Sequence, residues 1–397
     1  MKMISILGST GSIGVSSLNV ISVLDDNYKI FGLSCHKNIS LLYEQIKTHR
    51  PKYAVITDQS SYKYFIKLHE ITLEDTKILF GNEGLDIISS DKSVSTIIAA
   101  IVGFSCIHPV IKAIENNKTI LIANKEILVS AGDMIISHLK KSEAIILPID
   151  SEHNALLQVI LSSGLEYKIN DENYYKTRIK NLIITASGGP FINHKYDDLK
   201  KVTSFEATQH PTWNMGKKIS IDSSTMMNKG FEIIEARILF NINIDNITAL
   251  IHRQSKVHAF IEFFDGTIIS HMSNPDMRIP ISYAITYPER IYNYTCNDFL
   301  YDNFSFENVS IDKFPCYWLA RNVAGIGKNT GLILNAANEI SVEYFLEDKI
   351  SYLDIPNIIE DILEASEVIE HDSLETIVEN DLEVRKLTKN IIKTKYL

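Results

Sequence analysis

The stretch "SILGSTGSIG", residues 5–14, decides the fold of the first part of the chain. An apolar, β-prone run over 3–7 leads into glycines at positions 8, 11 and 14. A strand that turns tightly into a helix exposes backbone N–H groups at the helix N-terminus, where phosphate is favoured. We predict that Gly8 permits the turn, that Gly11 lets a pyrophosphate approach the backbone, and that Gly14 lets helix and strand pack closely. A tight turn without a ligand is the alternative, which the rest of the chain has to decide.

Apolar runs alternate with amphipathic stretches from this turn up to residue 150. Continuous runs of Val, Ile and Leu are typical of a parallel sheet that is covered on both faces. The pattern predicts an α/β fold with a doubly wound, Rossmann-like dinucleotide-binding domain over 1–150. Its expected strands are 3–7, 29–35, 53–57, 77–80, 95–101, 119–123 and 144–148.

The pattern changes after residue 150. A helix, a strand and a β-hairpin with an Asp265-Gly266 turn are expected at 152–162, 181–186 and 256–273. Near the C-terminus apolar residues recur every three or four positions, which indicates helices. We therefore expect an α+β catalytic domain over 151–311 and a helical C-terminal domain over 312–397.

Length and charge narrow the class of protein. A chain of 397 residues is too long for one hydrophobic core, and its net charge of −10 argues against binding nucleic acid. The sequence shows neither an apolar run of the roughly 20 residues that cross a bilayer nor a signal-peptide pattern. No membrane partner is therefore expected. The cysteines at 35, 106, 296 and 316 are scattered without a C-x-x-C pair, which indicates a reducing, cytoplasmic location.

Two groups of residues follow predicted strands of the first domain. The second strand ends in "SCHKN", which offers His36, Lys37 and Asn38 where an NAD-binding fold usually has a carboxylate. This favours NADP(H), although a solvated loop would look the same. The last strand leads into "LPIDSEHNALL", where Asp150 and Glu152 favour Mg²⁺ or Mn²⁺. The alternative is that Asp150 or Ser151 only caps the next helix.

The second domain contains two polar stretches. "ITASGGPF", 184–191, is a strand that runs into small residues, and its Ser187 and Gly188 amides suit an anion. In the stretch 210–236, four side chains could clamp a phosphorylated substrate: His210, Ser223, Asn228 and Lys229. Glu232 could complete a site of three carboxylates. Asn228, Glu232 and Glu235 share one helix face. Such a face is usually solvated, but the neighbouring clamp residues argue for a site here.

Seven motifs together resemble the 1-deoxy-D-xylulose 5-phosphate reductoisomerase family, in that family's order. They are "GSTGSIG", "ANKEILVSAG", "LPIDSEHNAL", "ASGGPF", "HPTWNMGKKISIDSSTMMNKGFEIIEA", "SNPDMRIPISYA" and "LNAANEISVEYF". The resemblance runs from residue 3 into the C-terminal helices.

The resemblance implies three sets of site residues. NADPH would be bound by Thr10, Gly11, Ser12, Ile13, Lys37, Asn38, Asn124, Glu126 and Gly216. The divalent metal, Mg²⁺ or Mn²⁺, would be held by Asp150, Glu152 and Glu232. The phosphorylated sugar would contact Lys125, Ser151, Glu152, Ser187, His210, Ser223, Asn228, Lys229 and Glu232, and the catalytic residues would be Lys125, Asp150, Glu152, Glu232 and His210. His36 departs from the family, which has a small residue there, and Glu235 is not carried over.

The resemblance also implies a reaction. The substrate 1-deoxy-D-xylulose 5-phosphate would be rearranged by breaking and remaking a C–C bond to give an aldehyde. Hydride transfer from NADPH would reduce this aldehyde to 2-C-methyl-D-erythritol 4-phosphate. Lys125 would either handle a proton or hold a substrate oxygen. The resemblance further implies a homodimer.

The sequence also allows two other functions, and one of its polar stretches has the character of a lid. Aspartate-semialdehyde dehydrogenases open with a similar glycine loop and use a cysteine nucleophile, for which Cys106 in "GFSCIHP" would be the candidate. A cofactor-sensing scaffold would have no reason to keep all three carboxylates. We interpret "HPTWNMGKK", 210–218, as a lid with Gly216 as hinge and Trp213 at its centre, against an ordered loop with a buried Trp213.

Overall fold

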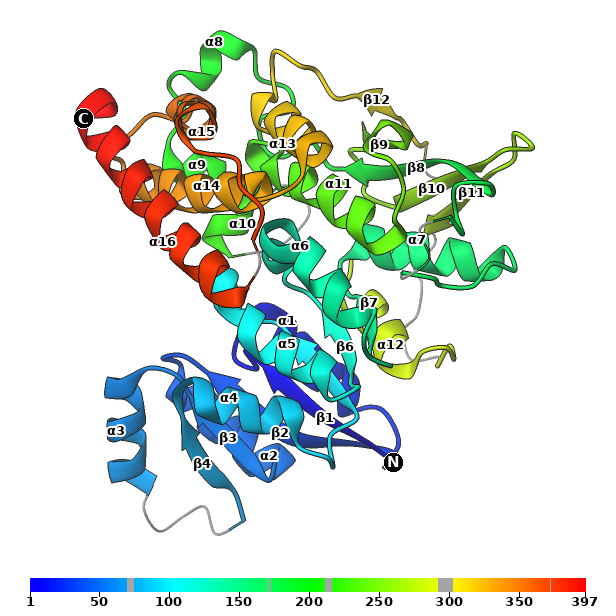
Figure 1. The fold of residues 1–397 in the computed structure, drawn as a ribbon, viewed down its shortest axis with the longest axis vertical. Coiled ribbons are helices and arrows are strands. Elements are labelled where there is room, and N and C mark those ends of the chain that lie inside the picture. The colour runs from blue at the N-terminus through cyan, green and yellow to red at the C-terminus, as the bar shows by residue number, and fades with distance from the viewer. Residues whose placement is uncertain (70–74, 170, 172, 211–215, 292–302, 372) are drawn as a thin grey trace. The chain divides into compact units, whose positions relative to one another are not determined.

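The computed structural model describes residues 1–69, 75–169, 171, 173–210, 216–291, 303–371 and 373–397. The chain divides into two compact units, each made of several segments (Figure 1). The first unit contains Met1–Ile127, Ser137–Asn154 and Asp276–Thr295, and the second contains Leu128–Ile136, Ala155–Pro275 and Cys296–Leu397.

The first unit is built on a seven-stranded sheet with the order β4-β3-β2-β1-β5-β6-β7. Every neighbouring pair is parallel. The central strands are buried along most of their length, as their continuous apolar runs require. All the strands predicted for this domain are confirmed: β1 (Lys2–Leu7), β2 (Tyr28–Cys35), β3 (Tyr53–Ile56), β4 (Lys77–Phe80), β5 (Thr96–Ala99), β6 (Thr119–Ile122) and β7 (Ile145–Pro148).

Helices connect these strands, and the strand order reverses at β1. In an open parallel sheet, ligands bind beyond the carboxyl ends of the strands at such a reversal. Helix α1 packs against α12, and α4 packs against α5. The helices of this unit are α1 (Ser12–Ile21), α2 (Ile39–His49), α3 (Gln59–His69), α4 (Gly81–Ser90), η1 (Phe104–Cys106), α5 (Ile107–Glu115) and α12 (Arg278–Thr286). Helices α6 (Lys125–Leu139) and α7 (Ser151–Ser162) contribute residues to both units.

The second unit contains a five-stranded mixed sheet with the order β11-β10-β8-β9-β12. Strands β8 and β9 are parallel, and the other pairs are antiparallel. The predicted hairpin is confirmed, and Gly266 adopts the left-handed backbone, φ +85°, that its turn requires. The strands are β8 (Ile179–Ala186), β9 (Ile247–Ile251), β10 (Val257–Phe263), β11 (Ile268–Met272) and β12 (Glu307–Asn308).

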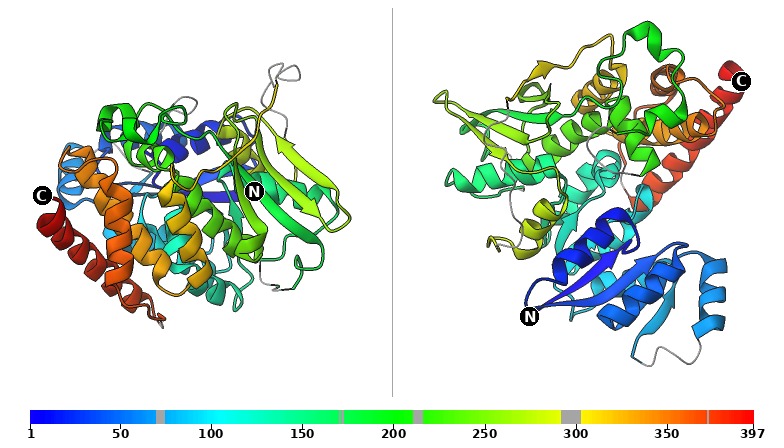
Figure 2. Two further views of the ribbon diagram at one scale, coloured as in Figure 1. Left: turned by 90° about the horizontal axis from the view of Figure 1, so that it is seen from above. Right: turned by 180° about the vertical axis from the view of Figure 1, so that it is seen from behind.

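Helices make up the rest of the second unit and confirm the helical C-terminal region. Helix α14 packs against α13, α15 and α16, and it is buried over most of its surface. Figure 2 shows these orange-to-red helices side by side. The helices are α8 (Tyr196–Leu199), α9 (Ser204–Ala207), α10 (Lys217–Ser224), α11 (Met227–Phe240), η2 (Ile244–Asn246), α13 (Pro315–Ile326), α14 (Thr330–Leu346), α15 (Asp354–Ala365), α16 (Leu374–Ile391) and η3 (Ile392–Tyr396). In the described part of the chain, no helix combines the length and apolar character that crossing a bilayer requires.

Candidate active site

The glycine turn between β1 and α1 has the geometry of a phosphate loop. Gly8 adopts φ +87°, and a Cβ there would lie 2.7 Å from the Ala100 carbonyl oxygen. A Cβ at Gly14 would clash with the Gly8 carbonyl oxygen. At Gly11 a Cβ would meet only that oxygen, at 3.4 Å, among the described atoms. The predicted turn and close-packing roles of Gly8 and Gly14 are therefore confirmed, and the pyrophosphate role of Gly11 stays a prediction.

The residues after β2 lie on the surface of the first unit. Lys37 and Asn38 are exposed, and the Asn38 side chain accepts a backbone N–H as the N-cap of α2. The His36 Nδ1 atom lies 3.0 Å from the Thr57 hydroxyl oxygen. Hydrogen bonds from nearby serines lower the pKa of Asp58, and the Lys37 charge contributes a smaller lowering. Lys37 is thus a surface cation, as a contact to a 2′-phosphate requires.

Asn124 connects the ends of two neighbouring strands. Its side-chain amide donates to the carbonyl oxygens of Ile101 and Gly103, the second at 2.6 Å. Its Oδ1 accepts the backbone N–H of Ile127 at 3.3 Å. These bonds fix the loop after β5 against the start of α6, where Glu126 is half-buried. They are structural, and the cofactor contact of Asn124 stays a prediction.

A lysine–carboxylate pair lies where β6 and β7 end. Lys125 Nζ is 2.5 Å from Asp150 Oδ2, and their side chains are 8% and 12% exposed. The other Asp150 oxygen is 3.8 Å from Nδ1 of His153, which is fully buried. Our sequence reasoning missed His153, although its position three residues after Asp150 places both on one helix face. The carboxylate of Asp150 is therefore largely buried and lies next to the side-chain nitrogens of Lys125 and His153.

Asp150 occupies the N-cap position of α7, as the helix-cap alternative predicts. The Asp150 backbone carbonyl accepts the N–H of Asn154 at 2.8 Å, so Asp150 is the first residue of the helical hydrogen-bond pattern. The Ser151 hydroxyl donates to Glu152 Oε2 at 2.7 Å. Asp150 begins the helix through its backbone, and its carboxylate pairs with Lys125.

In the second unit, the loop after β8 places Ser187 next to His210. Ser187 Oγ and His210 Nε2 are 3.1 Å apart. Burial lowers the pKa of His210 to about 4, so the ring is neutral near pH 7. Gly188 and Gly189 have φ of +84° and +68°, and a Cβ on Gly189 would lie 2.7 Å from the Ser223 carbonyl oxygen. Ser187, His210 and Ser223 therefore come from one packed cluster, as the predicted phosphate clamp requires.

The connection between α10 and α11 is a sharp corner. Gly216 is the N-cap of α10, and the helix ends at Ser224. Met226 then adopts φ +61°, an uncommon conformation for a residue with a side chain. The Met227 N–H donates to the Thr225 hydroxyl at 3.3 Å and supports the corner. This turn joins the helix that carries Ser223 to the helix that carries Asn228.

Glu232 is a buried carboxylate held by two side chains of its own helix. Asn228 Nδ2 donates to Glu232 Oε1 at 2.6 Å, and Lys229 Nζ pairs with Oε2. Lys229 and Glu232 are 4% and 1% exposed, and Glu235 is also buried. Glu232 and Glu235 on this helix face are therefore buried, in agreement with our expectation that the neighbouring clamp residues set it apart from an ordinary solvated face.

Two earlier expectations concern residues outside these clusters. Cys106 is completely buried, and burial raises the pKa of its thiol to about 12. A thiol that stays protonated and inaccessible is a poor nucleophile. Cys106 therefore does not suit the nucleophile that the aspartate-semialdehyde dehydrogenase alternative requires. Trp213, the centre of the predicted lid, lies outside the described residues, as do its neighbours 211–215.

The doubly wound sheet, the glycine turn and the buried lysine–carboxylate pairs define a class of protein, the dinucleotide-binding α/β oxidoreductases. Family comparisons make this specific. Residues 4–132 match the model of 1-deoxy-D-xylulose 5-phosphate reductoisomerase, residues 146–240 match the model of its C-terminal domain, and residues 272–387 match a further DXP reductoisomerase C-terminal domain. The chain belongs to the 1-deoxy-D-xylulose 5-phosphate reductoisomerase family.

Individual relatives agree with this family over the whole chain. The reductoisomerases of Caldanaerobacter subterraneus subsp. tengcongensis and Wigglesworthia glossinidia brevipalpis are each 42% identical to it, covering 97% and 99% of this chain and 98% and 100% of their own. A crystal structure of DOX-P reductoisomerase in complex with NADPH, fosmidomycin and magnesium has a TM-score of 0.91 at 37% identity, covering 99% of this chain and 100% of its own. The Zymomonas mobilis enzyme in complex with NADPH has a TM-score of 0.89 at 34% identity, with 99% of each chain covered.

Proposed function

We propose that this protein converts 1-deoxy-D-xylulose 5-phosphate to 2-C-methyl-D-erythritol 4-phosphate with NADPH and a divalent metal, in the non-mevalonate isoprenoid pathway. The observation that carries the proposal is the pair of buried lysine–carboxylate contacts, Lys125 with Asp150 and Lys229 with Glu232. Buried charges are costly, so a chain that retains them at family positions has a use for them. The reaction itself is inferred from membership of the 1-deoxy-D-xylulose 5-phosphate reductoisomerase family.

NADPH is proposed to bind along the carboxyl edge of the parallel sheet. The glycine turn and the N-terminus of α1 suit the pyrophosphate, because Gly11 leaves room for close approach. The exposed Lys37 suits the 2′-phosphate. The cofactor residues in the proposal are Thr10, Gly11, Ser12, Ile13, Lys37, Asn38, Asn124, Glu126 and Gly216.

Asp150, Glu152 and Glu232 are proposed as the metal ligands. Each offers a carboxylate oxygen, and hard oxygen donors suit Mg²⁺ and Mn²⁺. The carboxylates of Asp150 and Glu232 are paired with the ammonium groups of Lys125 and Lys229. A bound divalent ion supplies a Lewis acid that polarises the substrate carbonyl.

The phosphate of the substrate is proposed to bind in the cluster of the second unit. Ser187, Ser223 and Asn228 offer hydroxyl and amide donors, Lys229 offers a charge, and His210 offers a ring N–H. Because His210 is neutral near pH 7, it donates one hydrogen bond and adds no charge in the free protein. A dianionic phosphate next to the ring would raise its pKa, so binding would take up a proton at mildly acidic pH.

The proposed chemistry uses side chains next to the carboxylates. Ser151 donates a hydrogen bond to Glu152 and helps to hold this proposed metal ligand in place. Lys125, 8% exposed, either hands a proton to a substrate oxygen during the C–C rearrangement or holds that oxygen. The resulting aldehyde then accepts hydride from NADPH, and closure of a lid over 210–218 would keep water out.

The assembly and location of the protein also remain proposals. We infer a cytoplasmic homodimer that accepts Mn²⁺ as well as Mg²⁺, with NADPH-binding, catalytic and C-terminal helical parts over 1–150, 151–311 and 312–397. The described cysteines support a reducing compartment, because Cys35, Cys106 and Cys316 are free and buried. Light scattering on the purified protein would test the dimer.

A turnover assay tests the proposed function. The protein is mixed with 1-deoxy-D-xylulose 5-phosphate, NADPH and Mg²⁺ or Mn²⁺, and the absorbance of NADPH is followed with and without a chelator. We expect oxidation that stops on chelation and resumes when metal is added back. Oxidation that ignores the chelator would contradict the metal assignment, and no oxidation with either metal would contradict the function.

A further inference from the structure

Helix α10 carries Ser223, yet it has little hydrophobic packing of its own. The helix, "KKISIDSS", spans only Lys217–Ser224. Ile221 is its one fully buried apolar side chain, and its other buried side chains are polar: Ser220, Asp222 and Ser224. One apolar contact does not fix the rotation of a two-turn helix, so polar contacts have to do so.

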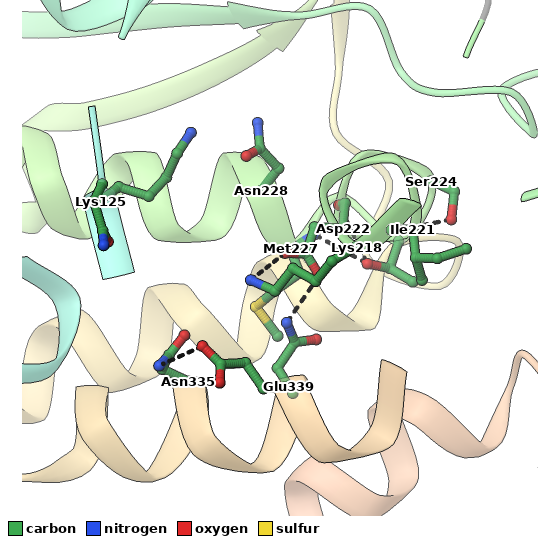
Figure 3. Close-up of polar contacts among 12 residues, drawn as sticks. Lys125, Lys218, Ile221, Asp222, Ser224, Met227, Asn228, Asn335 and Glu339 are labelled. Atoms are coloured by element: carbon green, nitrogen blue, oxygen red, sulfur yellow. Dashed lines mark hydrogen bonds and ion pairs between the residues drawn. The ribbon is translucent and has the colours of Figure 1, made fainter. Parts of the chain in front are cut away.

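Asp222 is the centre of those polar contacts. Its carboxylate is 3% exposed, and Lys218 Nζ lies 2.7 Å from Oδ2. The other oxygen, Oδ1, accepts a hydrogen bond from Asn338 Nδ2 on α14 at 2.8 Å. The Lys218 ammonium also lies 5.2 Å from the centre of the Phe231 ring on α11. Figure 3 shows Lys218 and Asp222 between these helices. Asp222 therefore ties α10 to α14, and Lys218 ties it to α11.

The Asn338 side chain is unusual for a residue that serves stability alone. It is completely buried, and within the described part of the chain its Oδ1 atom has no hydrogen-bond partner. A buried acceptor without a partner destabilises a fold, so an apolar residue of similar size would be less costly here. What Asn338 provides is a directed amide donor for the Asp222 carboxylate.

We propose that Asp222 and Asn338 are positioning residues that set α10, and with it the Ser223 hydroxyl, for the phosphate of the substrate. Ser223 follows Asp222 directly, so a rotation of α10 moves both. The Ser223 carbonyl oxygen is also packed against Gly189, where a Cβ would lie only 2.7 Å away. A displaced α10 would therefore disturb the loop that holds Ser187 as well. This inference rests on the proposed role of Ser223 in binding phosphate.

The next residue on α14 provides a matched control. Glu339 Oε2 accepts a hydrogen bond from Arg385 Nη2 on α16 at 2.6 Å, and its Oε1 accepts one from Asn335 at 3.2 Å (Figure 3 shows the second bond). Arg385 also bonds Asp381 at 2.7 Å. Glu339 thus ties α14 to α16, whereas Asn338 ties α14 to α10. Variants at the two positions remove neighbouring polar contacts of the same helix that lead to different partners.

The experiment compares Asn338→Leu with Glu339→Gln in the full-length protein. Hydrogen exchange of the α10 amides, 217–224, is followed by mass spectrometry, and KM and kcat are measured for 1-deoxy-D-xylulose 5-phosphate. For Asn338→Leu we expect faster exchange in α10 and a KM raised about tenfold, as for loss of one hydrogen bond to a charged group. NADPH affinity should stay near that of the wild type, and the melting temperature should fall because the buried Asp222 carboxylate loses a donor. For Glu339→Gln we expect a lower melting temperature with unchanged exchange in α10 and unchanged KM.

Each outcome decides the proposal. Wild-type exchange rates in α10 of the Asn338→Leu protein would overturn the positioning role, and so would a KM within twofold of the wild-type value. Equal effects of the two variants on α10 would also overturn it, because a general loss of stability would then explain both. The exchange measurement needs no turnover, so it decides whether Asn338 fixes α10 even if the wild-type protein fails the turnover assay, which would contradict the proposed function instead.

Discussion

At the scale of single residues, one buried acid of the site could be predicted from the sequence and another could not. Asp150 could be predicted, because it follows a buried strand at the carboxyl edge of a parallel sheet. The burial of Glu232 could not, since its neighbours are polar and their spacing suits a surface helix equally well. Only tertiary packing removes Glu232 and Glu235 from water.

Neutral variants of the two acids test the metal assignment. We expect Asp150→Asn or Glu232→Gln to lower kcat by a factor on the order of 10³, because each removes a charged ligand while keeping the side-chain shape. NADPH affinity should change little. Metal affinity, measured by titration with Mn²⁺, should fall in parallel. Either variant with wild-type turnover and bound metal would contradict the assignment.

Lys37 tests how the cofactor is recognised. Lys37→Asp places a negative charge where we expect the 2′-phosphate, so it should weaken NADPH binding and narrow the preference for NADPH over NADH. The measurement is the ratio of kcat/KM with the two cofactors. An unchanged ratio would mean that another group contacts the 2′-phosphate.

His258 predicts how stability depends on pH. The residue is buried, and burial, followed by the neighbouring His271, lowers its pKa from 6.5 to about 3. Between these values the unfolded chain binds a proton that the folded protein does not, so the free energy of unfolding should fall as pH falls below 6.5. The slope from this residue is at most about 1.4 kcal/mol per pH unit.

Urea unfolding at pH 7, 6 and 5 measures this slope. In His258→Gln, which cannot take up the proton, the decline between pH 6.5 and 5 should be shallower than in the wild type. The same slope in both proteins would show that other groups dominate acid unfolding.

At the scale of elements, the strands could be predicted well and the polar helices poorly. Apolar runs identified all the strands of the parallel sheet, because the central strands are buried on both faces and even the exposed edge strand β4 keeps an apolar run. The corner at Met226 could not be predicted, since nothing in "SSTMMNKG" marks a left-handed residue. The contact of α10 with α14 likewise joins Asp222 to a residue far along the chain, which local patterns do not encode.

Two alanine variants separate the roles of the glycines in the first turn. Gly14→Ala should destabilise the protein by about 1–3 kcal/mol or prevent folding, because its Cβ meets backbone atoms of the turn. Gly11→Ala has room for the Cβ, so its melting temperature should stay near that of the wild type while NADPH affinity falls. Wild-type NADPH affinity in Gly11→Ala would show that the pyrophosphate does not approach this position.

At the scale of the whole molecule, the proposed ligand sets are divided between the two units. The first unit contains the glycine turn, Lys125, Asp150 and Glu152, and the second contains Glu232 and the phosphate cluster with Ser187 and His210. The family resemblance in the sequence was needed to connect these sets, because residues far apart in the chain show no common period or spacing. The central claim is therefore the overall reaction, the conversion of 1-deoxy-D-xylulose 5-phosphate to 2-C-methyl-D-erythritol 4-phosphate.

The most direct test of that claim is the structure of the product. The protein is incubated with 1-deoxy-D-xylulose 5-phosphate, Mg²⁺ and NADPH carrying deuterium at both C4 positions, and the product is examined by ¹H NMR. We predict a methyl singlet, because the methyl group then sits on a quaternary carbon, and one deuterium on the new primary alcohol carbon. Deuterium on the carbon that carries the methyl group would show direct reduction of the keto group without rearrangement and would contradict the account.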